Sequence, residues 1–541
     1  MEINKEARQP LPSTTRNNQP LLPFAVLACF AIFWTGFIAF FGPDFGGVDA
    51  YIFRDAGCNY AAGRGFVAAS LPNNVAIIPA KLFAAYPPGS PLLFAPVAYL
   101  FGCGPLTGTF YNLALLTLLG AMVVCYLPPG TPARPQRLIG AAIVGATLPG
   151  GLFITDLSLD RPEPLSLLIF FLLLKLWSIS TSTWSRALLT GASGLVFLVE
   201  PYVGVTSWLL LAALTCHGFR QPGRLRILSS AALITLGTIA VWLTWIHHLD
   251  PDSINRLMSH AVGSNSGAGL VLRSGGALTS HAGPIHIYSL LVHEYSDRSR
   301  LLRVMPLVAL FCSFVVLGVL TPRTRNAASP GHCARPLLVF AAILLLFPLL
   351  IFPGQPNYFA ASTASLFAVV AVGRHEYSEQ MRRGSPTLLL LAIAALSSFP
   401  ALILSITIKV EQKNEYSNAA AQAARIKQEF TAKGYKSPRV LVDALHYFLY
   451  KPYLPDLYNS AYVASDDPLT RFDGVVQCYM KSTSHGIKDQ DYWELIDSSP
   501  PPTPLTLLGR RARRSVWYWS CDVYARKRAS PSPGTPSSGH P

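Results

Sequence analysis

Charged residues are scarce in this chain. Only 13% of its 541 residues are Asp, Glu, Lys or Arg, whereas 51% are hydrophobic. Soluble domains carry about 25% charged residues, so this chain has too little polar surface to cover a soluble fold of its length. The shortage excludes an ordinary cytosolic enzyme and a disordered scaffold. It predicts a polytopic membrane protein.

Several short motifs are also absent. The nine cysteines contain no CxxC pair, which argues against a metal finger or a thioredoxin-like site. The twelve histidines contain no HExxH, and the Gly-rich run 263–276 carries no GKS or GKT, so neither a zinc hydrolase nor a P-loop is expected. Cys58 with Cys103 and Cys478 with Cys521 would form disulfides in an oxidising compartment, a question that spacing alone leaves open.

Positive charge is in excess. Lys and Arg total 43 against 28 acidic residues, for a formal net charge of +15. In a soluble protein this excess would suggest a nucleic-acid partner. In a membrane protein, short cytoplasmic loops collect Lys and Arg, and this explanation fits the composition better. We expect no nucleic-acid partner.

Apolar segments of spanning length occur along most of the chain. A membrane-crossing helix needs about 20 mainly apolar residues. The segments that meet this need are 22–41, 106–127, 137–155, 227–247, 301–320 and 387–408, with shorter ones at 163–178, 337–352 and 359–373.

The stretch 187–217 is ambiguous by length alone. It forms one long kinked helix or two short helices that break at Glu200-Pro201. Arg186 precedes the stretch and Arg220 follows it. Both flanks favour the cytoplasm, so the chain must cross an even number of times. We predict two short helices, with Glu200 near the outer surface.

Together these spans predict an all-α polytopic membrane protein with about eleven transmembrane helices and a small extracytoplasmic α/β domain. The apolar piece 90–102 would break the pattern if it crossed, so we place it as a re-entrant or interfacial helix. The predicted divisions are a cytoplasmic tail (1–20), a transmembrane domain (21–408) with outer loops 42–105 and 248–300, a soluble domain (409–497) with a β-like run at 439–442, and a disordered basic, Pro-rich tail (498–541).

The first outer loop carries carboxylates close to the membrane surface. Asp44 and Asp49 directly follow the first span. A carboxylate there can act as a general base on a hydroxyl group. The structural alternative is that these carboxylates cap short helices, since an amphipathic stripe that starts at Tyr51 follows Asp49.

In the first outer loop Asp49 is followed by an aromatic residue, Tyr51, and by Gly63, and the loop later carries Tyr86-Pro87-Pro88. This pattern resembles the opening loop of the GT-C glycosyltransferases, and Tyr86-Pro87-Pro88 resembles the Tyr-Pro-Pro segment that begins a juxtamembrane helix in that group. The nearest likeness is to bacterial polyprenol-phosphate-mannose-dependent mannosyltransferases; protein O-mannosyltransferases and aminoarabinose transferases are more distant. The loop has no contiguous Asp-x-Asp or Asp-Glu pair, so either Asp44 or Asp49 is the base, and the spacing to Gly63 favours Asp49.

The resemblance implies that a sugar is taken from a polyprenyl-phosphate carrier on the extracytoplasmic side. Arg161 is the first candidate for the carrier phosphate, because a guanidinium pairs with phosphate through two hydrogen bonds. Lys81 and Arg64 are further candidates. Glu163 and Asp160 would support Arg161; the alternative is an Arg-Glu pair that closes a helix N-terminus.

Other supporting residues come from the same outer level. Tyr86 begins the Tyr-Pro-Pro segment. Glu200 lies at the break in 187–217, where GT-C proteins often carry a polar residue before Pro. Gln355 precedes the span 359–373 and is a candidate for sugar contact, although such a segment is more often a tight loop.

The sequence thus predicts an integral-membrane glycosyltransferase of hexosyltransferase type. It would move a sugar, with inversion, from a polyprenyl-phosphate carrier to an extracytoplasmic hydroxyl of a glycan, lipid or protein. The lipid-linked sugar is the donor substrate; the sequence leaves dependence on a divalent metal open and predicts no metal site. We expect the bacterial inner or plasma membrane. The alternatives are a transporter, which should place ionisable residues within the bilayer, and a membrane scaffold or assembly protein, which would leave the acidic loop unexplained.

Overall fold

The computed structural model describes residues 21–42, 48–68, 81–82, 87–126, 138, 141–142, 162–180, 182–200, 203–205, 207–209, 211–212, 224–249, 385–442, 446–454, 456–459, 472–480, 492–499, 506–507, 510–511 and 517–527. The predicted spans 301–320, 337–352 and 359–373 lie outside these residues, as does most of 137–155.

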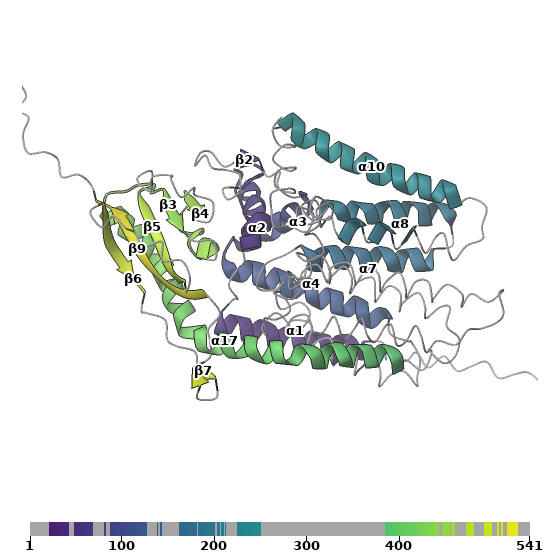
Figure 1. Cartoon of the computed structure of the whole chain (residues 1–541), viewed down its shortest axis with the longest axis horizontal. Helices are drawn as coiled ribbons and strands as arrows, with labels where there is room; N and C mark the ends of the chain where they lie inside the picture. The colour runs from purple at the N-terminus through teal and green to yellow at the C-terminus, as the bar shows by residue number, and fades with distance from the viewer. Residues whose placement is uncertain are drawn as a thin grey trace, which may run out of the picture.

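Six long helices form what we call the helix bundle. They are α1 (Leu22–Phe41), α4 (Pro105–Tyr126), α7 (Glu163–Ile179), α8 (Thr183–Leu195), α10 (Arg224–Leu249) and the first half of α17 (Ser385–Ala432). They pack in the order α17, α1, α4, α7, α8, α10, which Figure 1 shows from bottom to top. The predictions for 22–41, 106–127, 163–178, 227–247 and 387–408 are confirmed as helices.

The bundle has the composition of membrane-spanning structure. Within the described residues, Leu22–Phe41, Pro105–Met122 and Leu225–His248 are long and apolar enough to cross a membrane. Leu233 and Val241 on α10 and Ile32 on α1 are each at least 70% exposed. Large apolar side chains gathered on an outer surface indicate a lipid-facing or protein-facing surface. The predicted total of about eleven spans extends into residues that are not described.

The predicted break at Glu200 is confirmed. Helix α8 ends at Leu195, a 3₁₀ turn η2 (Val196–Leu198) follows, and helical structure resumes at 203–205. Gly204 allows the second helix to return closely, since a Cβ there would lie 2.2 Å from the backbone nitrogen of Phe197. The basic residues Arg186 and Arg226 lie in the first turns of α8 and α10, at the opposite ends of these helices from Glu200.

The first loop contains two helices that lie across one end of the bundle (Figure 1). They are α2 (Val48–Ala61) and α3 (Gly89–Phe101), and the short antiparallel strands β1 (Val67–Ala68) and β2 (Lys81–Leu82) lie between them in sequence. Helix α3 confirms the helix predicted at 90–102. Its 13 residues are too few to cross a bilayer, which takes about 20.

The C-terminal residues form what we call the sheet domain. Its strands are β3 (Val440–Val442), β4 (Leu457–Asn459), β5 (Gly474–Met480), β6 (Trp493–Ser498) and β9 (Trp517–Arg526), in the order β4-β3-β5-β9-β6. Strand β3 is parallel to β4 and β5, whereas β9 is antiparallel to β5 and β6. The helix α18 (Tyr447–Tyr450) follows β3, and β7 (Thr506–Leu507) pairs with β8 (Arg510–Arg511). The predicted α/β domain and its strand at 439–442 are confirmed.

Both predicted boundaries of this domain need correction. Helix α17 continues without interruption through Lys409, because Ala419, Ala423, Ile426 and Phe430 recur at helical spacing and are fully buried on the sheet domain. The predicted disordered tail from 498 contains β9, which lies between β5 and β6. Buried Cys521, Val523 and Ala525 show the alternation expected of a strand with one covered face.

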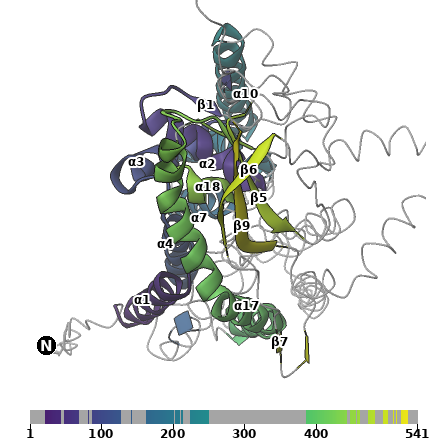
Figure 2. The ribbon, with the colours of Figure 1, turned by 90° about the vertical axis from the view of Figure 1, so that its left-hand side faces the viewer.

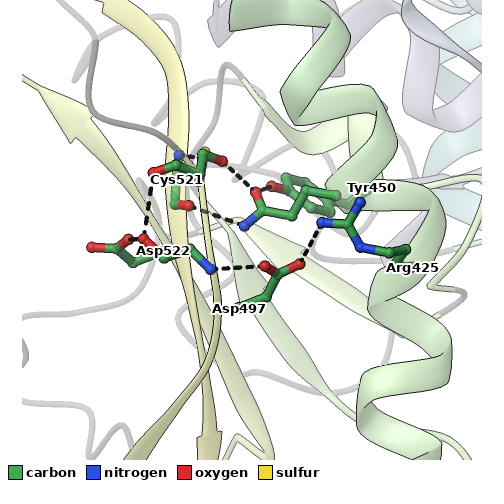
Figure 3. A network of polar contacts seen from close by, with 8 residues as sticks. Arg425, Tyr450, Asp497, Cys521 and Asp522 are labelled. Carbon is green, nitrogen blue, oxygen red and sulfur yellow. Dashed lines mark hydrogen bonds and ion pairs between the residues drawn. The ribbon is translucent and has the colours of Figure 1, made fainter.

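A polar network fixes α17 to the sheet (Figure 3). The amide of Gln422 on α17 donates to the Cys521 carbonyl at 3.1 Å and accepts from the hydroxyls of Tyr450 at 3.1 Å and Ser499 at 2.8 Å. At its edge, Arg425 forms an ion pair with Asp497 at 3.3 Å. Gln422 is buried, and both the nitrogen and the oxygen of its amide are hydrogen-bonded. A fully satisfied buried network of this kind fixes one position of α17 on the sheet.

Candidate functional site

The α2 and α3 helices meet by direct backbone contact. A Cβ on Gly57 of α2 would lie 2.5 Å from the Pro91 carbonyl oxygen of α3, so only glycine allows this approach. Phe94 and Ala98 of α3 are buried in one hydrophobic core with Cys58 of α2. The two helices of the first loop therefore form one packed unit.

The start of α3 lies against the break in the bundle. A Cβ on Gly89 would be 2.6 Å from the Leu198 carbonyl oxygen and 2.8 Å from Cγ2 of Val199. The start of α3, which follows Pro87 and Pro88, thus reaches the polypeptide immediately before Glu200. Glu200 itself is 7% exposed. The helix that follows the predicted Tyr-Pro-Pro segment and the chain just before the predicted Glu-Pro break, which are far apart in sequence, are therefore neighbours in space.

The first turn of α7 lies at the same end of the bundle as the start of α3 and the Glu200 break. Leu165 in its first turn packs with Val199 and with Leu115 of α4. Glu163 is the first residue of α7, so it lies at this end of the bundle. The last turns of α10 also reach it, since the ring centroids of Trp245 and Phe66 are 6.2 Å apart.

The predicted site residues divide into three groups. Glu163, Glu200 and the chain after Tyr86 belong to elements that the structure brings together. Asp49 lies in the first turn of α2, and Lys81 lies in β2, where its backbone pairs with Ala68. Outside the described residues lie Asp44, Tyr86, Asp160, Arg161 and Gln355.

Gly63 has a local structural role. It adopts φ +72° just after α2, its N–H donates to the Tyr60 carbonyl, and the next N–H, of Arg64, donates to the Asn59 carbonyl. This is the glycine-dependent pattern that terminates a helix. Gly63 therefore ends α2, and the sequence separation between Asp49 and Gly63 corresponds to the length of this helix.

A buried charge cluster joins α2 to the sheet domain. Nζ of Lys451 lies 3.3 Å from Oδ1 of Asp55, and the two side chains are 5% and 0% exposed. The Tyr447 hydroxyl donates to Asp55 at 3.1 Å and accepts from Lys451 at 2.8 Å. Asn59 donates to the second carboxylate oxygen at 3.2 Å. Sequence patterns did not indicate Lys451 or Tyr447, because nothing near them in sequence carries a motif.

The surroundings of this buried cluster shift the pKa values of Lys451 and Tyr447. Burial lowers the pKa of Lys451, an effect that the Asp55 carboxylate opposes and the nearby Arg64 reinforces. Burial raises the pKa of Tyr447 well above its ordinary value, and the charge of Asp55 and the hydrogen bond to it add to the rise. Arg64, predicted as a phosphate ligand, is exposed and acts on this cluster.

Arg54 adds further contacts at the interface between α2 and the sheet domain. Its guanidinium donates to the Gly104 carbonyl at 2.7 Å. Its central carbon lies 4.2 Å from the ring centroid of Phe448 on α18 and 5.3 Å from that of Phe94 on α3. A cation stacked between two aromatic faces is attracted by both ring quadrupoles. Arg54 thus binds α2 to α3 and to the sheet domain.

Both cysteine pairs that the sequence left open are disulfides. Cys58–Cys103 joins α2 to the segment between α3 and α4, and Cys478–Cys521 joins β5 to β9. Among the described residues, His446 with Cys478 and Cys521 is a group whose ligand atoms lie within 4.8 Å of one another. Because the two sulfurs are bonded to each other, neither is the thiolate that a metal requires.

Comparison with known proteins identifies the fold of this chain. No protein-family model matches the chain, and no curated protein matches it in sequence. The crystal structure of ArnT from Cupriavidus metallidurans bound to undecaprenyl phosphate matches with a TM-score of 0.54 at 12% identity, over 93% of this chain and 97% of that chain. ArnT from the same organism in the apo state matches with a TM-score of 0.51 at 13% identity, over the same shares. The chain therefore has the fold of ArnT, which confirms at the level of the fold the resemblance that the sequence suggested.

Proposed function

We propose that this chain is an integral-membrane glycosyltransferase that uses a sugar linked to a polyprenyl phosphate. The observation that carries the proposal is the fold shared with ArnT over nearly the whole of both chains, in a structure that holds undecaprenyl phosphate. The convergence of α3, α7 and the Glu200 break at one end of the bundle supports a site at that end.

The donor phosphate binds beside the start of α7. Arg161 precedes the helix, which begins at Glu163, and its guanidinium pairs with two phosphate oxygens. Lys81 and Arg64 of the first loop add positive charge, and Glu163, Asp160, Tyr86 and Glu200 complete the polar surroundings. Positive charge placed where the leaving phosphate gains negative charge lowers the barrier.

Asp49 is the general base. It removes the proton from the acceptor hydroxyl as that oxygen forms a bond to the anomeric carbon, and the bond from that carbon to the carrier phosphate breaks. One direct displacement inverts the anomeric configuration. Asp44 is the alternative base, and Gln355 a candidate for sugar contact. The sugar is a hexose or a close relative, and the acceptor is a glycan, lipid or protein.

The membrane holds the carrier. The isoprenoid tail lies in lipid against apolar helices of the bundle, so the phosphate is delivered at the surface level. Arg186 and Arg226 begin helices at the end of the bundle away from the sheet domain. By the positive-inside rule we take that end to face the cytoplasm, and the sheet domain and the site then lie outside.

Carrier binding tests the proposal directly. Detergent-purified protein is heated with undecaprenyl phosphate or with undecaprenol, which lacks the phosphate. At 100 times its dissociation constant, a ligand of the folded state adds about 2.7 kcal/mol. We expect stabilisation by the phosphate only, its loss in Arg161→Ala, and its retention in the matched control Arg226→Ala, which removes an exposed arginine at the other end. No stabilisation by undecaprenyl phosphate in folded protein would contradict the proposal.

A further inference from the structure

The cluster around Asp55 places charges where water does not reach. Asp55 is fully buried and Lys451 nearly so, and both carboxylate oxygens are engaged, one by Lys451 and Tyr447 and the other by Asn59. A buried ion pair is a weak source of stability, because desolvation offsets the attraction, and in some proteins such a pair instead specifies one geometry. The interface between α2 and α18 thus specifies position more than it adds stability.

The C-terminal end of α18 (Tyr447–Tyr450) connects two different parts of the protein. Tyr450 donates to Gln422 of α17, and the adjacent Lys451 contacts Asp55 of α2. Gln422 in turn is tied to the sheet through Cys521 and Ser499 (Figure 3). Helix α18, labelled in Figure 2, packs against α17 and against β4 of the sheet. A continuous chain of buried contacts therefore runs from a bundle helix to the first loop.

The other end of the first loop is attached to the same helix. Gly42, which ends α1 with φ +93°, packs under the Tyr416 ring of α17, where a Cβ would lie 2.6 Å from a ring carbon. The Lys409 ammonium donates to the Gly42 carbonyl at 3.4 Å. The first turn of α2 therefore comes, in sequence, between two attachments to α17 and the sheet domain, at Gly42 and at Asp55.

We propose that Lys451 and Tyr447 are positioning residues for Asp49: by holding Asp55, they fix the orientation of the helix that presents the candidate base. The inference rests on the proposed function, because it takes Asp49 as the base. Asp49 precedes Asp55 by six residues on α2, which is about 9 Å along a helix axis. A rotation of α2 about its attachment would displace Asp49, and a 1 Å misplacement at a reacting centre can lower the rate about 10²-fold.

The test separates positioning from folding and from binding. Full-length Lys451→Met and Tyr447→Phe are compared with Lys433→Met, which breaks an exposed ion pair with Glu494 in the same domain. Turnover is followed as release of labelled sugar from undecaprenyl-phosphate sugar, with membrane extract as the source of acceptor. Amide hydrogen exchange of residues 48–61 reports the order of α2, and the double variant Asp55→Asn/Lys451→Met removes both charges together.

For Lys451→Met we expect a fall in kcat of about 10²-fold, little change in KM for the donor, and faster exchange in α2. Tyr447→Phe changes both quantities in the same direction, the double variant recovers part of kcat, and Lys433→Met resembles the wild type. An active wild type whose Lys451→Met and Tyr447→Phe variants keep kcat would overturn the positioning role and leave the proposed function standing. A folded wild type that neither binds undecaprenyl phosphate nor releases sugar would overturn both.

Discussion

The Tyr447 hydroxyl donates a hydrogen bond to Oδ1 of Asp55 at 3.1 Å, across a separation of 392 residues. The contact lies in a hydrophobic core that the first loop and the sheet domain share, with Cys58 and Phe94 on one side and Tyr447 and Ile426 on the other. The sheet domain is therefore built onto the loop that carries the candidate base. It is part of the site's framework and not an appended module.

The buried ion pair predicts unequal effects on stability. Lys451→Met should destabilise the protein by about 3–5 kcal/mol, because it leaves the Asp55 carboxylate buried without its cation. Asp55→Asn/Lys451→Met should cost less, since no charge is then stranded. Lys433→Met, at an exposed pair, should cost about 0–1 kcal/mol. Thermal unfolding in one detergent measures all three, and equal costs for Lys451→Met and Lys433→Met would contradict the burial of the pair.

Replacing the candidate base should separate chemistry from binding. A positioned general base contributes about 10²–10⁴ in rate, so Asp49→Asn should lose this factor in turnover while undecaprenyl phosphate still stabilises the protein. Asp44→Asn is the matched comparison and should lose less. Near-full turnover in purified Asp49→Asn would refute its assignment, and a large loss in Asp44→Asn alone would transfer the role to Asp44.

The contact of α3 with the Glu200 break predicts a sensitive glycine. In Gly89→Ala the new Cβ would meet the Leu198 carbonyl at 2.6 Å, and backbone cannot yield as a flexible side chain does. We expect lower thermal stability and weaker stabilisation by undecaprenyl phosphate. Gly237→Ala on α10, where nothing lies within 4 Å of the added Cβ, is the control and should be neutral or slightly stabilising. If both variants behave alike, α3 does not pack on the break.

The disulfide of the first loop should hold α2 in place. Cys58–Cys103 closes a loop with a sequence separation of 45, and such a crosslink is worth about 2–4 kcal/mol. Cys58→Ser/Cys103→Ser should lose stability in this range and exchange amide hydrogens faster over 48–61. Cys29→Ser, which replaces an exposed free cysteine on α1, should not. A double variant as stable as Cys29→Ser would show that α2 is held without the disulfide.

The raised pKa of Tyr416 leads us to expect a loss of protein stability at alkaline pH. Burial, with a smaller contribution from Tyr453, raises the pKa of Tyr416 to about 12. An unfolded tyrosine ionises near pH 10. Its contribution to stability is therefore complete below pH 10 and falls as pH rises from about 10 to 12, by up to about 1.4 kcal/mol per pH unit. The free energy of unfolding of Tyr416→Phe should fall less steeply over this interval, and parallel curves would contradict the raised pKa.

Local patterns predicted much of the architecture. Runs of apolar residues gave the positions of α1, α4, α7 and α10, and the basic flanks of 187–217 gave the break at Glu200, because hydropathy and positive charge act over a helix length. The same reasoning ended the sheet domain too early. The prolines and arginines of 500–514 outweighed the alternation in Trp517–Arg526, which pairs with strands distant in sequence and so has no local partner to reveal it.

The candidate site likewise contains features that local sequence patterns indicate and others that only the fold brings together. The acidic first loop, its glycine and the Tyr-Pro-Pro segment are short motifs that sequence alone can indicate, and the fold they suggested is the fold found. The partner of Asp55 is different, because Lys451 is one of 43 basic residues and only folding selects it. Sequence determined which segments are apolar, where they break and which residues are candidates for the chemistry. Tertiary structure decided which charges are removed from water together, since burial is a property of the packed chain and belongs to no single segment.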